Sequence, residues 1–158
     1  MIMGRTTMRL EYKGFNELVT KYQGLGGDVK KLVAKELERV GRKIGEDTEE
    51  AISDANLPAH GAFHSKARNT EKSVVKNPKA TNLGSYIISV GVGFDFEAKG
   101  GAGGYLIKGY YQRYHGTPRV MKYDERLHDM YVRRKYMREI EEMMQEDVAR
   151  EIKKLMEK

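Results

Sequence analysis

The feature that most constrains the fold of this chain is a long apolar stripe in its first third. Apolar side chains recur at steps of three and four residues at Val29, Leu32, Val33, Leu37, Val40, Ile44 and Ile52. This spacing places them on one face of an amphipathic helix of about 25 residues. Asp28 is the expected N-cap, because its carboxylate can accept hydrogen bonds from the amides of the first turn. Thr48 interrupts the stripe.

Two glycines, Gly41 and Gly45, lie inside this predicted helix. Each costs a helix roughly 0.5–1 kcal/mol relative to alanine. Small residues also permit close packing, including packing against a neighbouring chain. We interpret both positions as plain tolerance by the helix.

A second apolar stripe closes the chain, at Met137, Ile140, Met144, Val148, Ile152 and Leu155. It predicts a C-terminal helix of about 20 residues. Glu146 and Arg150 have the i,i+4 spacing of an ion pair on its exposed side. Each amphipathic helix needs a partner layer that covers its apolar face.

The segments between the two stripes supply that layer. Residues 8–12 alternate apolar and polar as in a short strand, and residues 15–22 suggest a short helix. Residues 85–92 are rich in β-branched and aromatic residues and form the best strand, with 70–76 as the expected hairpin partner. For 105–114 we favour a helix turning into a strand near Tyr114.

Together these elements predict an α+β fold. A long N-terminal amphipathic helix and a C-terminal helix pack on a small antiparallel β-sheet. Residues 1–158 form a single domain. Flexible loops are expected near 59–69 and 99–104, because neither segment has the apolar periodicity that would offset its ordering cost.

The sequence shows no catalytic or cofactor signature. It has no cysteine, which excludes disulfides and cysteine-based zinc sites. His60 and His64 flank Gly61 with no acid between them, unlike a zinc-protease helix, and the glycine run at 100–104 is not followed by the Gly-Lys-Ser/Thr of a phosphate loop. We therefore expect neither enzyme activity nor a bound cofactor or metal. No apolar run approaches the ~20 residues that span a bilayer, so no membrane contact is expected.

The formal net charge is +6, and one stretch contributes four cations without any acid. Residues 105–122 combine cations with tyrosines, and the candidate contacts are Lys108, Tyr110, Tyr111, Arg113, Tyr114, Arg119 and Lys122. Such a mixture can line a protein interface or stack bases and hold phosphates. The tyrosines could also belong to the domain's own core, and the sequence leaves these three alternatives open.

The order of these pieces resembles the tail-component family of small neck proteins in tailed bacteriophages. Members open with a strand and a Gly-hydrophobic-x-Glu-Leu start, here Gly14-Phe15-Asn16-Glu17-Leu18. They carry a Tyr-x-x-(aromatic or Val)-x-Gly-Thr segment before the final helix. Here that segment is Tyr111-Gln112-Arg113-Tyr114-His115-Gly116-Thr117. The match follows nearly the whole chain in order through short motifs.

The resemblance implies a structural protein of the head–tail neck or the tail-completion ring, located in the virion and assembled in the host cytoplasm. Its partners would be further copies of itself in a ring, six by family analogy, and neighbouring head-completion and tail-tube proteins. DNA passing through the ring would make transient, non-specific contacts. The alternative is a small basic nucleic-acid-binding protein, supported by the charge and the tyrosine-rich basic stretch.

Overall fold

The computed structural model describes residues 6–12, 15–22, 26–55, 73–82, 88–95, 107, 110–114, 117–121 and 123–157, with only the backbone in 110–114 and 117–121. The elements in chain order are β1 (Thr6–Glu11), α1 (Phe15–Lys21), α2 (Gly26–Asp54), β2 (Thr81–Asn82), β3 (Ile88–Asp95), β4 (Tyr110–Tyr114), β5 (Thr117–Met121), α4 (Glu125–Tyr131) and α5 (Lys135–Met156). The predicted flexible loops at 59–69 and 99–104 lie outside the described residues.

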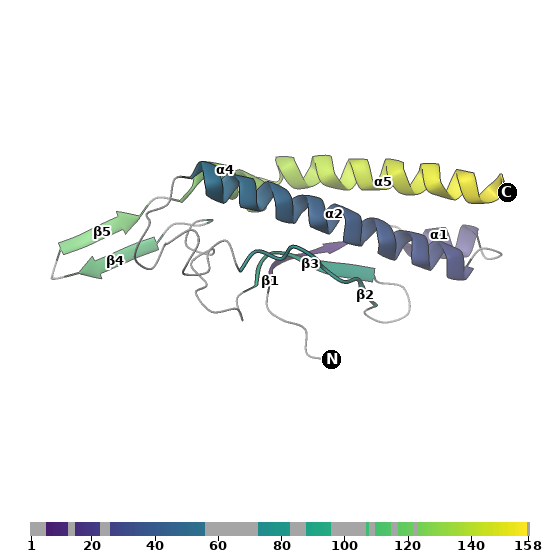
Figure 1. Cartoon of the computed structure of the whole chain (residues 1–158), viewed down its shortest axis with the longest axis horizontal. Coiled ribbons are helices and arrows are strands. Elements are labelled where there is room, and N and C mark those ends of the chain that lie inside the picture. Colours follow the sequence, from purple (N-terminus) through teal and green to yellow (C-terminus); the bar gives the residue numbers. More distant parts are fainter. Residues whose placement is uncertain are drawn as a thin grey trace.

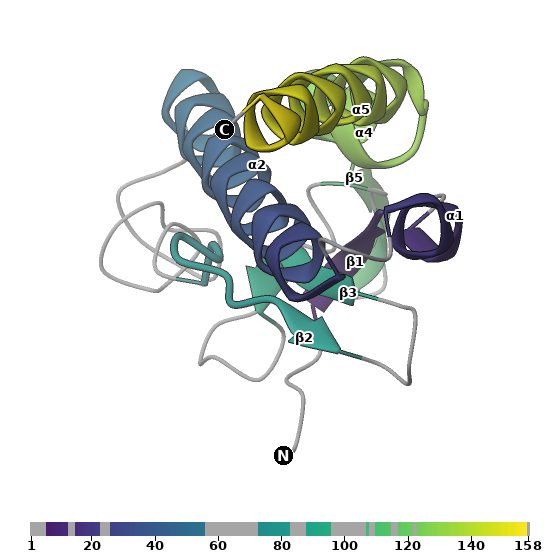
Figure 2. The ribbon, with the colours of Figure 1, turned by 90° about the vertical axis from the view of Figure 1, so that its right-hand side faces the viewer.

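The predicted α+β class is confirmed. The long helices α2 and α5 run antiparallel to one another in one layer, and a sheet in the order β1-β3-β2 lies beneath α2 (Figures 1 and 2). No helix in the described part of the chain carries an apolar stretch that would cross a bilayer.

Both predicted apolar stripes lie where the periodicity placed them. The main core joins the stripe of α2, the stripe of α5 and the upper face of the sheet, through Leu10, Ile88, Val90 and Val92. Leu32 and Leu155, at the margins of the stripes, are only partly buried. The predicted cap at Asp28 is wrong, because α2 already begins at Gly26 and Asp28 lies within its first turn.

The interruption of the stripe at Thr48 is also buried. Thr48 is fully enclosed, and its hydroxyl donates to the carbonyl of Ile44 one turn earlier, at 2.6 Å. Its oxygen lies 2.6 Å from the hydroxyl of Tyr131 at the end of α4. Because the Thr48 proton is already used, Tyr131 donates this second bond. Burying the polar Thr48 within the apolar stripe therefore leaves no hydroxyl without a hydrogen-bond partner.

Interpreting Gly41 and Gly45 as plain tolerance is wrong. A Cβ atom at Gly45 would lie 2.5 Å from the carbonyl oxygen of Val75, and one at Gly41 would lie 2.5 Å from the Pro78 ring. The segment 73–80 therefore packs directly on the backbone of α2. The close packing occurs within the chain.

The sheet differs from the predicted hairpin of 70–76 with 85–92. The strand β3 extends to Asp95, and it is central, pairing with β1 on one edge and β2 on the other. Within the described part of 70–76, Val74 forms a single bridge to Phe94. The Val75 amide donates to the Gly93 carbonyl at 2.8 Å, and the Asp95 amide donates to the Ser73 carbonyl at 2.7 Å. The nearer segment therefore does pair with β3, at 93–95 and not within 85–92, while β1 takes the other edge.

Within 105–114, Ile107 is helical as favoured, but the strand begins earlier than expected, since Tyr110–Tyr114 is a strand throughout. It pairs with β5 in a second, two-stranded sheet. The following helix α4 was not expected from the charged sequence. Asp124 caps it, accepting the Leu127 amide at 3.0 Å.

Candidate assembly interface

The structure places five of the seven candidate residues on one two-stranded ribbon. Tyr110, Tyr111, Arg113 and Tyr114 lie on β4, and Arg119 lies on β5. Lys108 and Lys122 lie outside the described residues. The ribbon therefore gathers most of the predicted site.

The register of this hairpin is regular. Tyr114 pairs with Thr117 across a two-residue connection, and Arg113 pairs with Pro118 on the next rung. In an antiparallel ladder closed by two residues, the pair next to the closing pair is not hydrogen-bonded. Pro118, which lacks an N–H, therefore fits the ladder, and the outer edge of β5 lacks a donor there.

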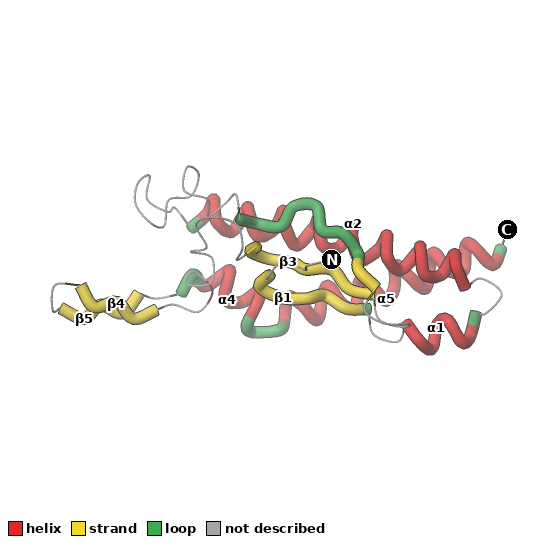
Figure 3. The backbone as a smooth tube through the Cα atoms, turned by 90° about the horizontal axis from the view of Figure 1, so that it is seen from below, coloured by secondary structure: helices red, strands yellow, loops and turns green. Residues whose placement is uncertain are grey.

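The hairpin extends past the C-terminal end of α2, away from the three-stranded sheet (Figures 1 and 3). Its sequence between Tyr110 and Met121 holds two arginines and no acidic residue. Its charge is therefore not neutralised by any carboxylate within the hairpin. A projecting basic ribbon is suited to contact another molecule.

One residue of α4 holds both ends of the segment that carries the hairpin. His128 Nδ1 donates to the carbonyl oxygen of Ile107, before β4, at 2.8 Å. The same imidazole stacks on the ring of Tyr123, after β5, with 3.9 Å between ring centroids. The base of the hairpin is thus fixed to a helix.

That helix is in turn held firmly to the body. Leu127 and Met130 of α4 are buried in a second core cluster with Ala51, Ile52, Val74, Phe94 and Ile107. Outside the cluster, Arg126 contacts the carboxylates of Asp54 at 2.6 Å and Glu50 at 3.4 Å, both on α2. The hairpin is consequently mounted on a packed support.

Two tyrosine hydroxyls join the α4–α5 corner to α2. Tyr136 donates to Asp47 at 2.6 Å, and Lys43 contacts the same carboxylate at 3.1 Å. Burial, and then the bond to the Asp47 carboxylate, raise the pKa of Tyr136 well above its ordinary value. Burial raises the pKa of Tyr131 to about 12, against a smaller opposite effect of the Thr48 hydroxyl. Both phenols remain neutral donors at physiological pH.

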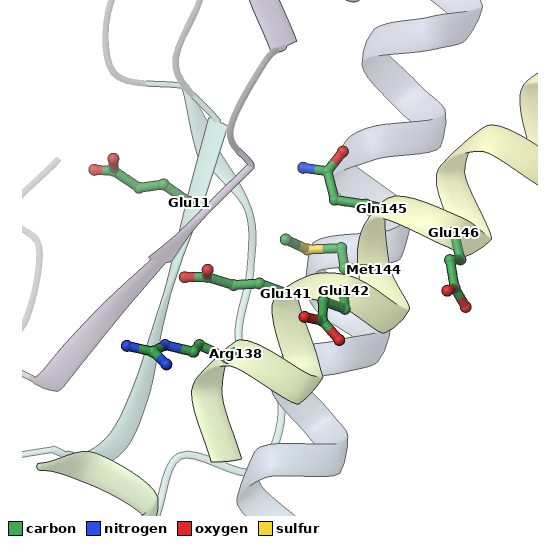
Figure 4. Close-up of a pocket in the computed structure, with 7 residues that line it drawn as sticks. All are labelled: Glu11, Arg138, Glu141, Glu142, Met144, Gln145 and Glu146. Atoms are coloured by element: carbon green, nitrogen blue, oxygen red, sulfur yellow. The ribbon is translucent and has the colours of Figure 1, made fainter. Parts of the chain in front are cut away.

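A second surface feature is an open groove where α5 meets β1. Glu11 comes from β1, and the other lining residues come from α5: Arg138, Glu141, Glu142, Met144, Gln145 and Glu146 (Figure 4). The side chains of Glu11, Arg138 and Glu141 extend to the same side in this view. Four carboxylates against one guanidinium make the groove acidic.

Sequence reasoning missed the hairpin and the groove for different reasons. The hairpin had a local signal, since two short runs flank His115-Gly116, a two-residue connection with a turn-forming glycine. For the groove, the sequence shows only the run of acidic residues on the C-terminal helix. The position of Glu11 beside that run depends on the fold.

Comparison with known protein families, curated proteins and solved structures finds no match for this chain. Among the described residues, no three acidic, histidine or cysteine side chains are grouped so as to hold a metal ion.

Proposed function

We propose that this protein is a structural subunit of the head–tail neck or tail-completion ring of a tailed bacteriophage, forming an oligomeric adaptor through which DNA passes. The observation that carries the proposal is the β4–β5 hairpin, a projecting arm mounted on a packed helix. The arm contains the Tyr-x-x-Tyr-x-Gly-Thr segment on which the family resemblance rests.

Such a role requires surfaces that join copies and neighbours, which this arm provides. Tyrosine and arginine are favoured at the centres of protein interfaces. The anchoring of the arm by His128 and the α4 core lowers the entropy cost of presenting it to a partner.

The decisive experiment removes the gene from the phage or prophage that encodes it. We expect separate filled heads and tails in electron micrographs, and joined, infectious particles after complementation with the intact gene. Mass spectrometry of purified virions should detect the protein at a few copies per particle. Normal joined virions from the deletion strain, or virions that lack the protein, would refute the role.

The second candidate, a nucleic-acid-binding protein, has its own supporting observation. A two-stranded antiparallel ribbon can enter the major groove of DNA, and this ribbon carries Arg113 and Arg119. The two candidates predict different affinities. A conduit must let DNA slide, so the neck subunit should bind duplex only with the ~10⁻⁴–10⁻⁶ M dissociation constants of non-specific binding at physiological salt.

Fluorescence anisotropy with duplexes of several sequences separates the candidates. For the neck subunit we expect weak binding without sequence preference. Changing Arg113 and Arg119 to Gln should lower the slope of log K against log salt by about 2 at most, since each phosphate contact contributes about 1. Nanomolar, sequence-selective binding by the isolated wild-type chain would favour the second candidate.

A further inference from the structure

The groove between β1 and α5 has carboxylates that the rest of the body does not satisfy. Within the described part of the chain, Glu11, Glu142 and Glu146 make no ion pair. Several other carboxylates on α2 and α5 are held by cations of the same chain, at Glu36, Asp47, Asp54, Asp147 and Glu151. Among the described residues the groove therefore retains negative charge, which a cationic partner can neutralise.

The groove also meets a sheet edge at Glu11. In the described sheet β1 pairs with β3 alone and forms the outer strand. The Tyr12 amide bonds to the carbonyl of Ile88, and hydrogen-bonded pairs alternate along an antiparallel ladder. The backbone groups of Glu11 consequently face away from β3, on the outer side of the sheet. Such an edge is a natural place for a second polypeptide to dock.

We propose that this groove receives the β4–β5 hairpin of a second copy of the same chain. The hairpin supplies the opposite charge, since its sequence holds Arg113 and Arg119 and no carboxylate. Anionic partners such as DNA are disfavoured by the four carboxylates.

The geometry makes the contact intermolecular and directional. The hairpin lies at one end of the molecule, beyond α2 and α4 (Figures 1 and 3), whereas the groove is lined by Glu11 of β1 and by residues of α5. A chain cannot fill its own groove in this arrangement. Joining the arm of one copy to the groove of the next is a head-to-tail contact, which builds a closed ring or an open filament.

This inference deepens the proposed function by naming the surface through which copies join, and it rests on that function only for the biological context. The test uses charge reversal in two full-length variants. Variant A carries Arg113→Glu and Arg119→Glu. Variant B carries Glu142→Lys and Glu146→Lys. The control carries Glu139→Lys on α5 and Glu157→Lys at its C-cap, which changes the net charge by the same amount as variant B but outside the groove.

Sedimentation velocity over a concentration series reports the association. We expect the wild type and the control to form the same oligomers, and variants A and B each to associate at least about tenfold more weakly, because like charges then face one another. Mixing A with B should restore assembly, since the acidic arm of A fits the basic groove of B and the basic arm of B fits the acidic groove of A. Circular dichroism verifies that all variants are folded.

Three results would overturn the docking: a wild type that stays monomeric at all concentrations, oligomers that persist in A and B, or a mixture that fails to assemble. Persistent oligomers would leave the neck role intact and move the interface elsewhere. The deletion phenotype and virion composition judge that role independently, so the two failures are distinguishable.

Discussion

The buried hydroxyl pair between α2 and α4 provides a quantitative test of the fold. Replacing Thr48 by Val keeps the shape of the side chain but removes the acceptor that Tyr131 uses. A buried hydroxyl left without a partner costs about 1–3 kcal/mol of stability. Replacing Tyr131 by Phe costs less, about 0.5–1.5 kcal/mol, because the Thr48 hydroxyl still donates to Ile44.

The double variant distinguishes this pair from two independent sites. With both hydroxyls removed, no donor is stranded, so the combined loss should be smaller than the sum of the single losses by about 1 kcal/mol. In a chain of this size, 1 kcal/mol corresponds to a change in melting temperature of roughly 2–4 °C. Urea unfolding of the four proteins, followed by circular dichroism, measures the coupling. Losses that add to within about 0.3 kcal/mol would refute the bond as drawn.

Two further predictions concern stability. Gly45→Ala should destabilise the protein by about 1–2 kcal/mol, because overpacking against the Val75 carbonyl outweighs the helical gain of alanine. Glu46→Ala, exposed on the same turn, should stay within about 0.5 kcal/mol in the same urea titration, and a stabilised Gly45→Ala would contradict the close packing. Folding raises the pKa of Tyr131 to about 12 from an ordinary value of 10.0. The contribution of its neutral phenol to folding stability is therefore complete below pH 10 and is lost as the pH rises towards 12. Melting temperatures between pH 9 and 12 should fall less steeply in Tyr131→Phe, and identical slopes would argue against a buried phenol.

Local periodicity was enough to predict the two long helices. The apolar residues of α2 and α5 recur at helical spacing, and an amphipathic face of that length must be buried whatever covers it. The same argument gave the α+β class, since the strand signal at Ile88–Val92 provides a second layer. The charged, acid-free stretch around Arg113 and Arg119 was visible by composition alone.

Contacts between distant segments decided the rest. Thr48 looked like a break in the stripe, because its partner Tyr131 lies 83 residues away. Gly45 was interpreted as tolerated, because the sequence around it gives no sign that the Val75 carbonyl packs against this position. The strand β3 pairs with β1 as well as with β2, and neither strand carries a local signal for that long-range pairing.

The candidate site also has one part that the sequence predicts and one part that only the tertiary structure creates. The basic arm is a property of one continuous segment, so its residues could be named from the sequence. The acidic groove exists only because folding brings Glu11 of the first strand beside Glu142 and Glu146 of the last helix. Charge along a chain is fixed by covalent order, whereas a surface that unites two ends of the chain is made by the packing of their apolar faces.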